Sequence, residues 1–116
     1  MKAIATVGEI APGKTKKFLL DCAGTEVEGF VLNAGGEHHA WVNRCRHVPM
    51  SLDWVENRFF TEDGRFLQCA THGALYRPET GECVAGPPCG RSLHRLPLRI
   101  EAGEIVADCP PALPDD

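Results

Sequence analysis

Two short motifs in this chain of 116 residues each place a thiol and an imidazole side chain close together. The first motif is Cys45-Arg46-His47, and the second is Cys69-Ala70-Thr71-His72-Gly73. Thiolate sulfur and imidazole nitrogen are ligands that zinc and iron centres take from proteins. Cys45, His47, Cys69 and His72 therefore predict a metal site to which two separate segments of the chain contribute.

The order of these four residues limits the kind of metal centre. Two cysteines and two histidines can hold Zn²⁺ tetrahedrally, although a zinc finger has both cysteines before both histidines. Haem attachment would require a second cysteine in the second motif, which has none. The other cysteines lack the spacing of an all-cysteine iron–sulfur site. Two possibilities remain, a structural zinc ion and an asymmetric 2Fe–2S cluster with two thiolates on one iron and two imidazoles on the other.

The segments around the motifs have the pattern of short antiparallel strands. Leu96, Leu98 and Ile100 alternate with Pro97 and Arg99, and Glu104–Ala107 can return beside them after a turn at Ala102-Gly103. Because proline supplies no N–H group, we expect Pro97 at an edge or a bulge. Turn signals recur about every ten residues and predict an all-β sandwich or barrel. The other expected strand pairs are 17–20 with 27–32, 31 with 39–42, 59–60 with 66–67, and 76 with 83–84.

Composition excludes several classes of protein. The length suits one domain, which we place at residues 1–116 with an extended tail from about residue 108. The net charge of −4 offers no basic field for nucleic acid or an anionic membrane. No apolar run approaches the ~20 residues of a membrane span, and the first residues lack the apolar core of a secretory signal. We therefore expect a cytoplasmic protein.

The six cysteines are consistent with that location. In a reducing compartment, metal ligation is a better explanation for the two motifs than a disulfide framework. Of the remaining cysteines, we expect Cys83 and Cys89 to be buried free thiols, and Cys22 and Cys109 to pack or to lie in loops.

The two motifs together resemble the Rieske 2Fe–2S domain, in which Cys-x-His is followed by Cys-x-x-His-Gly. The resemblance extends over roughly residues 2–107. Further matching features are the Asn43-Arg44 lead-in, Leu52, Tyr76, the turn at 78–81, Gly86-Pro87-Pro88 and the closing hairpin from Leu96 to Val106. It implies a two-part antiparallel β-sandwich with a smaller cluster-binding β subdomain at about residues 43–89.

The resemblance also implies roles for individual residues. Cys45 and Cys69 would bind one iron, and His47 and His72 the other. Tyr76 would lie close to the cluster and is a candidate hydrogen-bond donor to a cysteine sulfur. Gly86, Pro87 and Pro88 would form a loop that shields the cluster.

The implied function is one-electron transfer by a small Rieske-type ferredoxin. Its partners would be a reductase and a terminal oxygenase or similar redox proteins. A mononuclear iron site of two histidines and a carboxylate is not evident, so we expect an electron-transfer component rather than a complete catalyst. Two alternatives remain, a small nitrite-reductase-type Rieske subunit and a non-redox assembly module with zinc at the same four residues.

Three positions differ from respiratory Rieske proteins. Met50 and Thr71 stand where those proteins have two cysteines that form a disulfide, and Ala74 stands where they have a serine. Hydrogen bonds to the cluster sulfurs raise the reduction potential. The missing serine therefore predicts a potential in the lower half of the Rieske span of about −150 to +300 mV.

Overall fold

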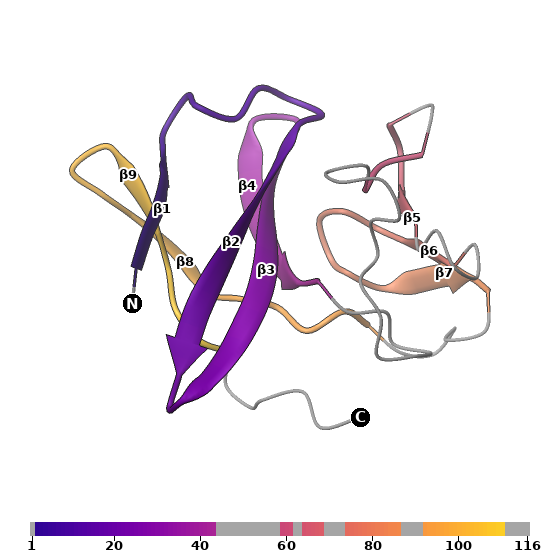
Figure 1. Cartoon of the computed structure of the whole chain (residues 1–116). Coiled ribbons are helices and arrows are strands. Elements are labelled where there is room, and N and C mark those ends of the chain that lie inside the picture. The colour runs from indigo at the N-terminus through magenta and orange to yellow at the C-terminus, as the bar shows by residue number, and fades with distance from the viewer. Residues whose placement is uncertain (1, 44–58, 62–63, 69–73, 87–91, 111–116) are drawn as a thin grey trace.

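The computed structural model describes residues 2–43, 59–61, 64–68, 74–86 and 92–110. Within these ranges the regular secondary structure consists of β-strands alone. They form three antiparallel sheets of three strands each (Figure 1). Sheet A contains, in order, β1 (Lys2–Thr6), β9 (Glu104–Ala107) and β8 (Leu98–Glu101). Sheet B contains β2 (Thr15–Cys22), β3 (Thr25–Ala34) and β4 (Glu37–Val42). Sheet C contains β5 (Leu67–Gln68), β6 (Leu75–Tyr76) and β7 (Cys83–Ala85).

The predicted all-β class is confirmed, and several predicted pairs are present. The β2–β3 hairpin closes at Ala23-Gly24 and the β8–β9 hairpin at Ala102-Gly103. In both turns the two central residues have positive φ, at 55° and 86° in the first and at 50° and 80° in the second. This is the pattern of a two-residue turn that matches the twist of the flanking strands. The described residues contain no helix that could cross a bilayer.

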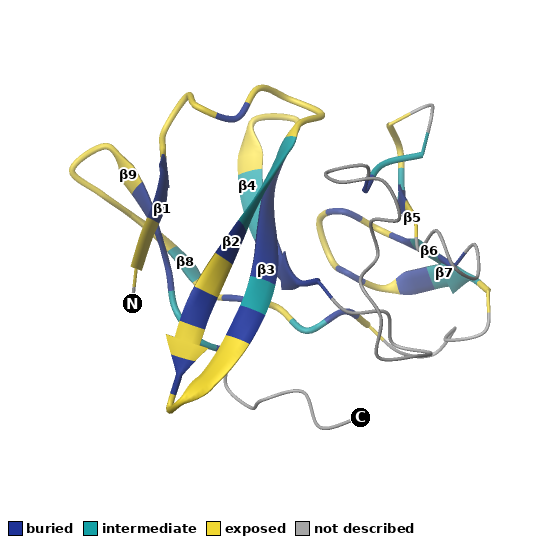
Figure 2. Cartoon of the chain, viewed as in Figure 1, coloured by how far each residue is buried: buried dark blue, intermediate teal, exposed yellow. Residues whose placement is uncertain are grey.

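Sheet B is the middle layer, because its two faces contribute to different hydrophobic cores (Figures 1 and 2). On β3, Val27 and Val31 pack in a core with sheet A, whereas Phe30 and Leu32 pack in a core with sheet C. Successive side chains of a strand point to opposite faces, so an uninterrupted apolar run marks a strand buried on both sides. Burial on both faces of sheet B explains why Phe30, Val31 and Leu32 are all inaccessible to solvent.

A segment without regular structure connects the layers along the free edge of β4. The N–H of Val42 donates to the carbonyl of His94 at 2.9 Å, and the N–H of Leu96 donates to the carbonyl of Ala40 at 3.0 Å. The chain then enters β8, an edge strand of sheet A, immediately after Pro97. Pro97 therefore lies outside the strand ladder, as predicted.

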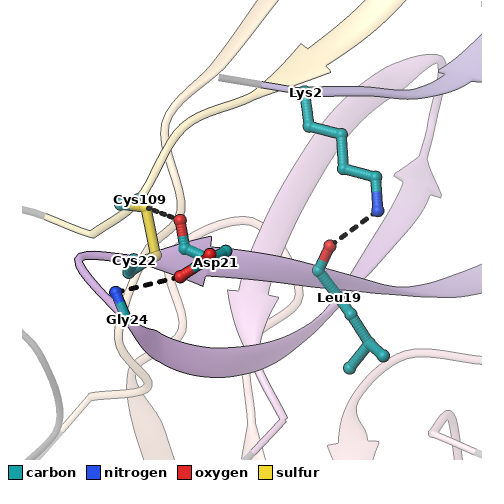
Figure 3. The surroundings of a disulfide bond; sticks show 6 residues. All are labelled: Lys2, Leu19, Asp21, Cys22, Gly24 and Cys109. Atoms are coloured by element: carbon teal, nitrogen blue, oxygen red, sulfur yellow. Dashed lines mark hydrogen bonds between the residues drawn. A yellow bond between two sulfur atoms is a disulfide. The ribbon is translucent and has the colours of Figure 1, made fainter.

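Cys22 and Cys109 both pack in the core shared by sheets A and B, as expected, but the sequence did not predict that they form a disulfide (Figure 3). Their Cα atoms are 5.8 Å apart although 87 positions separate them in the sequence. Cys22 ends β2 in sheet B, and Cys109 follows β9 of sheet A by two residues. Packing of sheet A against sheet B therefore brings the two sulfurs together. The expected tail from about residue 108 extends beyond residue 110, where the described part ends.

Candidate metal centre

The four predicted ligands, Cys45, His47, Cys69 and His72, lie outside the described residues. The structure does describe the strands on both sides of the second motif. Gln68 of β5 pairs with Leu75 of β6, so the motif lies in the connection between two neighbouring antiparallel strands. The first motif begins two residues after Asn43, a buried residue whose side-chain amide donates to a Glu28 carboxylate oxygen at 2.6 Å. The described residues thus anchor the chain beside both motifs.

Tyr76 is fully buried in sheet C, as expected for a residue close to an enclosed cofactor. It pairs with Leu67 on one side and Cys83 on the other, and shares its core with Phe59. Phe59 is also inaccessible to solvent, and its ring stacks on that of Phe30 with centroids 4.0 Å apart. This stacked pair joins sheet C to sheet B. The proposed hydrogen bond from Tyr76 to a cluster sulfur stays a prediction.

Gly86 occupies a space in which a side chain cannot fit. Its φ is +99°, and a Cβ atom at this position would lie 2.8 Å from the Cα atom of Ala74. Ala74 directly follows the second motif, and Gly86 directly precedes Pro87 and Pro88, which lie outside the described residues. The close approach of Gly86 to Ala74 therefore places the start of the predicted proline loop beside the second motif. The arrangement fits a shielded metal centre.

Trp41 of β4 attaches sheet C to sheet B. Its indole N–H donates to the carbonyl of Pro78 at 3.0 Å, and the side chain is 1% exposed. A Cβ atom on Gly81 would lie 2.6 Å from Cζ3 of the indole, so the turn at residues 78–81 packs directly on the ring. The sequence analysis missed this contact. The only indication in the sequence is the tryptophan itself, because a buried indole needs an acceptor for its N–H group.

Arg95 strengthens the same junction from the side of the connecting segment. Its guanidinium carbon lies 4.4 Å from the centroid of the Trp41 ring, and its Nη2 donates to the carbonyl of Glu79 at 2.9 Å. Arg95 therefore contacts both sheet B and the β6–β7 turn. This role of Arg95 was not evident from the sequence, because its partners Trp41 and Glu79 are distant from it along the chain.

His39 lies against Arg95, and burial lowers its pKa. The positive charge of Arg95 lowers this pKa further, against the opposing effect of Glu37. Nη1 of Arg95 is 3.4 Å from Nδ1 of His39, so a neutral imidazole can accept a hydrogen bond from the guanidinium. The carboxylate of Glu37 lies 3.8 Å from Nε2. The position thus favours the uncharged ring.

Two further observations concern metal ligands and thiols. Among the described residues, no three histidine, cysteine, aspartate or glutamate side chains are grouped to hold a metal ion. Cys83 is a buried thiol outside any disulfide, as predicted, and its Sγ donates to the carbonyl of Ala85 at 3.1 Å. The corresponding prediction for Cys89 concerns a residue outside the described part.

Comparison with known proteins identifies the family. Residues 1–106 match the model of the Rieske [2Fe-2S] domain. The chain is 31% identical to the 3-phenylpropionate/cinnamic acid dioxygenase ferredoxin subunit of Escherichia coli K12, over 72% of this chain and 74% of the relative. It is 28% identical to the biphenyl dioxygenase ferredoxin subunit of Pseudomonas sp. KKS102, over 89% and 86%.

The fold is also found in a solved structure, described as a complex of reduced oxygenase and oxidized ferredoxin in carbazole 1,9a-dioxygenase. One chain of it superimposes with a TM-score of 0.70 at 22% identity, over 91% of this chain and 99% of the other. The family match spans nearly the whole sequence and includes both cysteine–histidine motifs. The chain belongs to the Rieske [2Fe-2S] domain family, whose cofactor is a Rieske-type 2Fe–2S cluster.

Proposed function

We propose that this protein is a one-electron carrier that binds its cluster through Cys45 and Cys69 on one iron and through His47 and His72 on the other. The observation that carries the proposal is the family match over residues 1–106, with both motifs intact inside it. Two thiolates and two imidazoles are the donor set of a Rieske centre. Zinc at the same residues is the competing possibility, and it would give a colourless protein.

The cluster supplies a one-electron couple, in which the site changes from neutral to a single negative charge. The protein's own residues keep that site dry and rigid. Tyr76 and Phe59 are fully buried beside the strands that lead into and out of the second motif. Gly86 allows the proline loop to start against Ala74. Trp41 holds the β6–β7 turn on sheet B through the Pro78 carbonyl. These contacts support a site that changes little between redox states.

The proposed electron donor is a reductase, and the proposed acceptor is a terminal oxygenase. Two relatives are named as ferredoxin subunits of dioxygenases, and the superimposed ferredoxin is described in complex with its oxygenase. Substrate chemistry would then occur in the partner, and this chain would deliver electrons one at a time. We also propose a cytoplasmic location, which rests on the similarity to these ferredoxin subunits.

A reductive titration of the purified holoprotein tests the carrier function. We expect the visible absorption of the cluster to bleach on addition of one electron per chain from dithionite and to recover fully on reoxidation. Because no substrate site is proposed in this chain, reoxidation by oxygen should release no hydroxylated product from an added aromatic acid. Loss of iron during one redox cycle, or the absence of any electron uptake, would contradict the proposal.

A further inference from the structure

The Cys22–Cys109 disulfide connects two sheets at a point remote in sequence from the cluster motifs. Cys22 lies at the end of β2, directly before the turn at Ala23-Gly24, and Cys109 follows the last strand of sheet A (Figure 3). Asp108 donates its N–H to the carbonyl of Pro97 at 3.0 Å. The next residue along the chain, Cys109, is then attached to sheet B through its disulfide with Cys22.

The two sulfur atoms have different surroundings. Cys22 is 4% exposed, whereas Cys109 is half-buried. Sγ of Cys109 also lies 3.7 Å from the carbonyl oxygen of Asp21. A disulfide sulfur has no proton to donate, but a Cys109 thiol would be within reach of this acceptor. A reduced Cys109 would therefore have an acceptor for its thiol proton.

The contacts that hold sheets A and B together do not depend on the disulfide. Ile4, Phe18, Leu96 and Ile105 belong to one buried core that both sheets share. Lys2 of β1 donates from its ammonium group to the carbonyl of Leu19 in β2 at 3.0 Å. The backbone hydrogen bonds between β4 and residues 94–96 likewise involve neither cysteine. A folded protein with two thiols at these positions is therefore expected.

We propose that Cys22 and Cys109 form a reversible thiol–disulfide exchange site for a cytoplasmic dithiol reductant. The inference rests on the proposed cytoplasmic location, because disulfides in that compartment are usually transient, catalytic or redox-sensing. The more exposed sulfur, Sγ of Cys109, is the point of attack. Exchange would control whether the C-terminal segment is covalently attached to sheet B.

The exchange balances in two steps. A thiolate of the reductant attacks Sγ of Cys109, a mixed disulfide forms, and the bond to Cys22 breaks. Cys22 leaves as a thiolate and takes up a proton. The second thiol of the reductant then attacks the mixed disulfide, releases Cys109 as a thiol and becomes oxidised. In total the dithiol transfers two electrons and two protons to the pair.

A trapping experiment on the folded holoprotein tests the proposal. The probe is thioredoxin with its second active-site cysteine replaced by serine, which cannot complete the second step. We expect a mixed disulfide with the wild-type chain, and peptide mass mapping should locate it at Cys109. With intact reduced thioredoxin the cluster absorption should be unchanged, and iodoacetamide added after acid quenching and denaturation should alkylate both Cys22 and Cys109, as located by peptide mass mapping. Oxidised glutathione should restore the disulfide.

Two controls keep the outcome interpretable. The Cys22→Ser/Cys109→Ser variant should form no adduct, and Cys83→Ser should behave like the wild type, because Cys83 is buried and outside the disulfide. A disulfide that resists the probe until denaturant is added would overturn the proposal, as would capture at Cys22. Trapping and mass mapping do not involve the cluster, so a protein that lacks iron but exchanges this disulfide would contradict only the proposed electron-carrier function.

Discussion

The guanidinium group of Arg95 lies over the indole of Trp41, with 4.4 Å between the guanidinium carbon and the ring centroid. A cation over an aromatic face is attracted by the ring quadrupole. Arg95 belongs to the segment that runs along the free edge of β4, and Trp41 belongs to β4 itself. Both side chains also donate to backbone carbonyls in the turn that leads into β7. The pair therefore fixes the position of sheet C, into which the second cysteine–histidine motif is inserted.

Replacement of Trp41 by phenylalanine should destabilise this junction. The variant keeps an aromatic ring but leaves the carbonyl of Pro78 without the indole donor. Loss of one partner from a buried hydrogen bond costs about 1–3 kcal/mol. Urea unfolding should show a loss of free energy in this range. A loss below about 0.5 kcal/mol would mean that the hydrogen bond contributes little to the junction. Arg95→Lys is a useful companion, since it keeps the charge and removes the planar group.

Gly86→Ala should disturb the metal centre, and Gly8→Ala provides a matched control. The two glycines have nearly the same φ, at +99° and +96°, so both substitutions impose a similar backbone cost of about 1–2 kcal/mol. Only at Gly86 would the new methyl group meet backbone, 2.8 Å from the Cα atom of Ala74. We expect Gly86→Ala alone to lose bound iron more rapidly to a chelator. Equal rates for the two variants would contradict a shielding role for this segment.

Stability should decrease at acid pH partly because of His39. Its pKa in the folded protein is lowered from 6.5, so the unfolded chain binds more protons between the two values. The stabilising contribution is therefore complete above about pH 6.5 and is lost as the pH falls through the folded-state pKa. His39→Gln keeps a hydrogen-bond acceptor for Arg95 and removes the titration. The urea midpoint of the wild type should fall more than that of the variant between pH 8 and pH 5, and parallel curves would contradict this.

Tyr76→Phe tests the suggested hydrogen bond to the cluster. If the hydroxyl donates to a sulfur, it stabilises the reduced site, and its removal should lower the reduction potential. A difference of about 1 kcal/mol corresponds to about 40 mV for one electron. Protein-film voltammetry measures the change. Phe59→Leu alters the same buried core without removing a hydroxyl group, and should leave the potential nearly constant. An unchanged reduction potential in Tyr76→Phe would show that the Tyr76 hydroxyl does not donate a hydrogen bond to the cluster.

Removal of the disulfide should lower stability without abolishing folding. In the chain-entropy model, a cross-link that closes a loop of this length contributes about 4–5 kcal/mol by restricting the unfolded chain. The Cys22→Ser/Cys109→Ser variant should therefore unfold at lower urea concentration and keep the circular dichroism of the wild type. Identical unfolding midpoints in the absence of reductant would show that the bond is not formed in solution.

Local patterns were sufficient to predict most of the hairpins, but not β1 and not the contacts between distant segments. The alternation of apolar and other residues around Leu98 and the turn at Ala102-Gly103 depend only on neighbouring residues. The closing hairpin could therefore be predicted from the local sequence. The Cys22–Cys109 bond depends instead on how sheet A packs on sheet B, and the sequence separation of 87 gives no hint of it. The contacts of Arg95 with Trp41 and Glu79 were missed for the same reason. The two motifs come from residue type and spacing, whereas the assignment of their cysteines and histidines to two irons comes from the resemblance to the Rieske domain and remains a prediction.

The most direct test of the central claim is pulsed EPR of the dithionite-reduced protein, combined with iron and acid-labile sulfide analysis of the same sample. We predict two irons and two sulfides per chain, with nitrogen hyperfine coupling to the reduced centre that disappears in His47→Cys/His72→Cys. A sample that contains zinc in place of iron would contradict the account, and so would an iron–sulfur signal without nitrogen coupling.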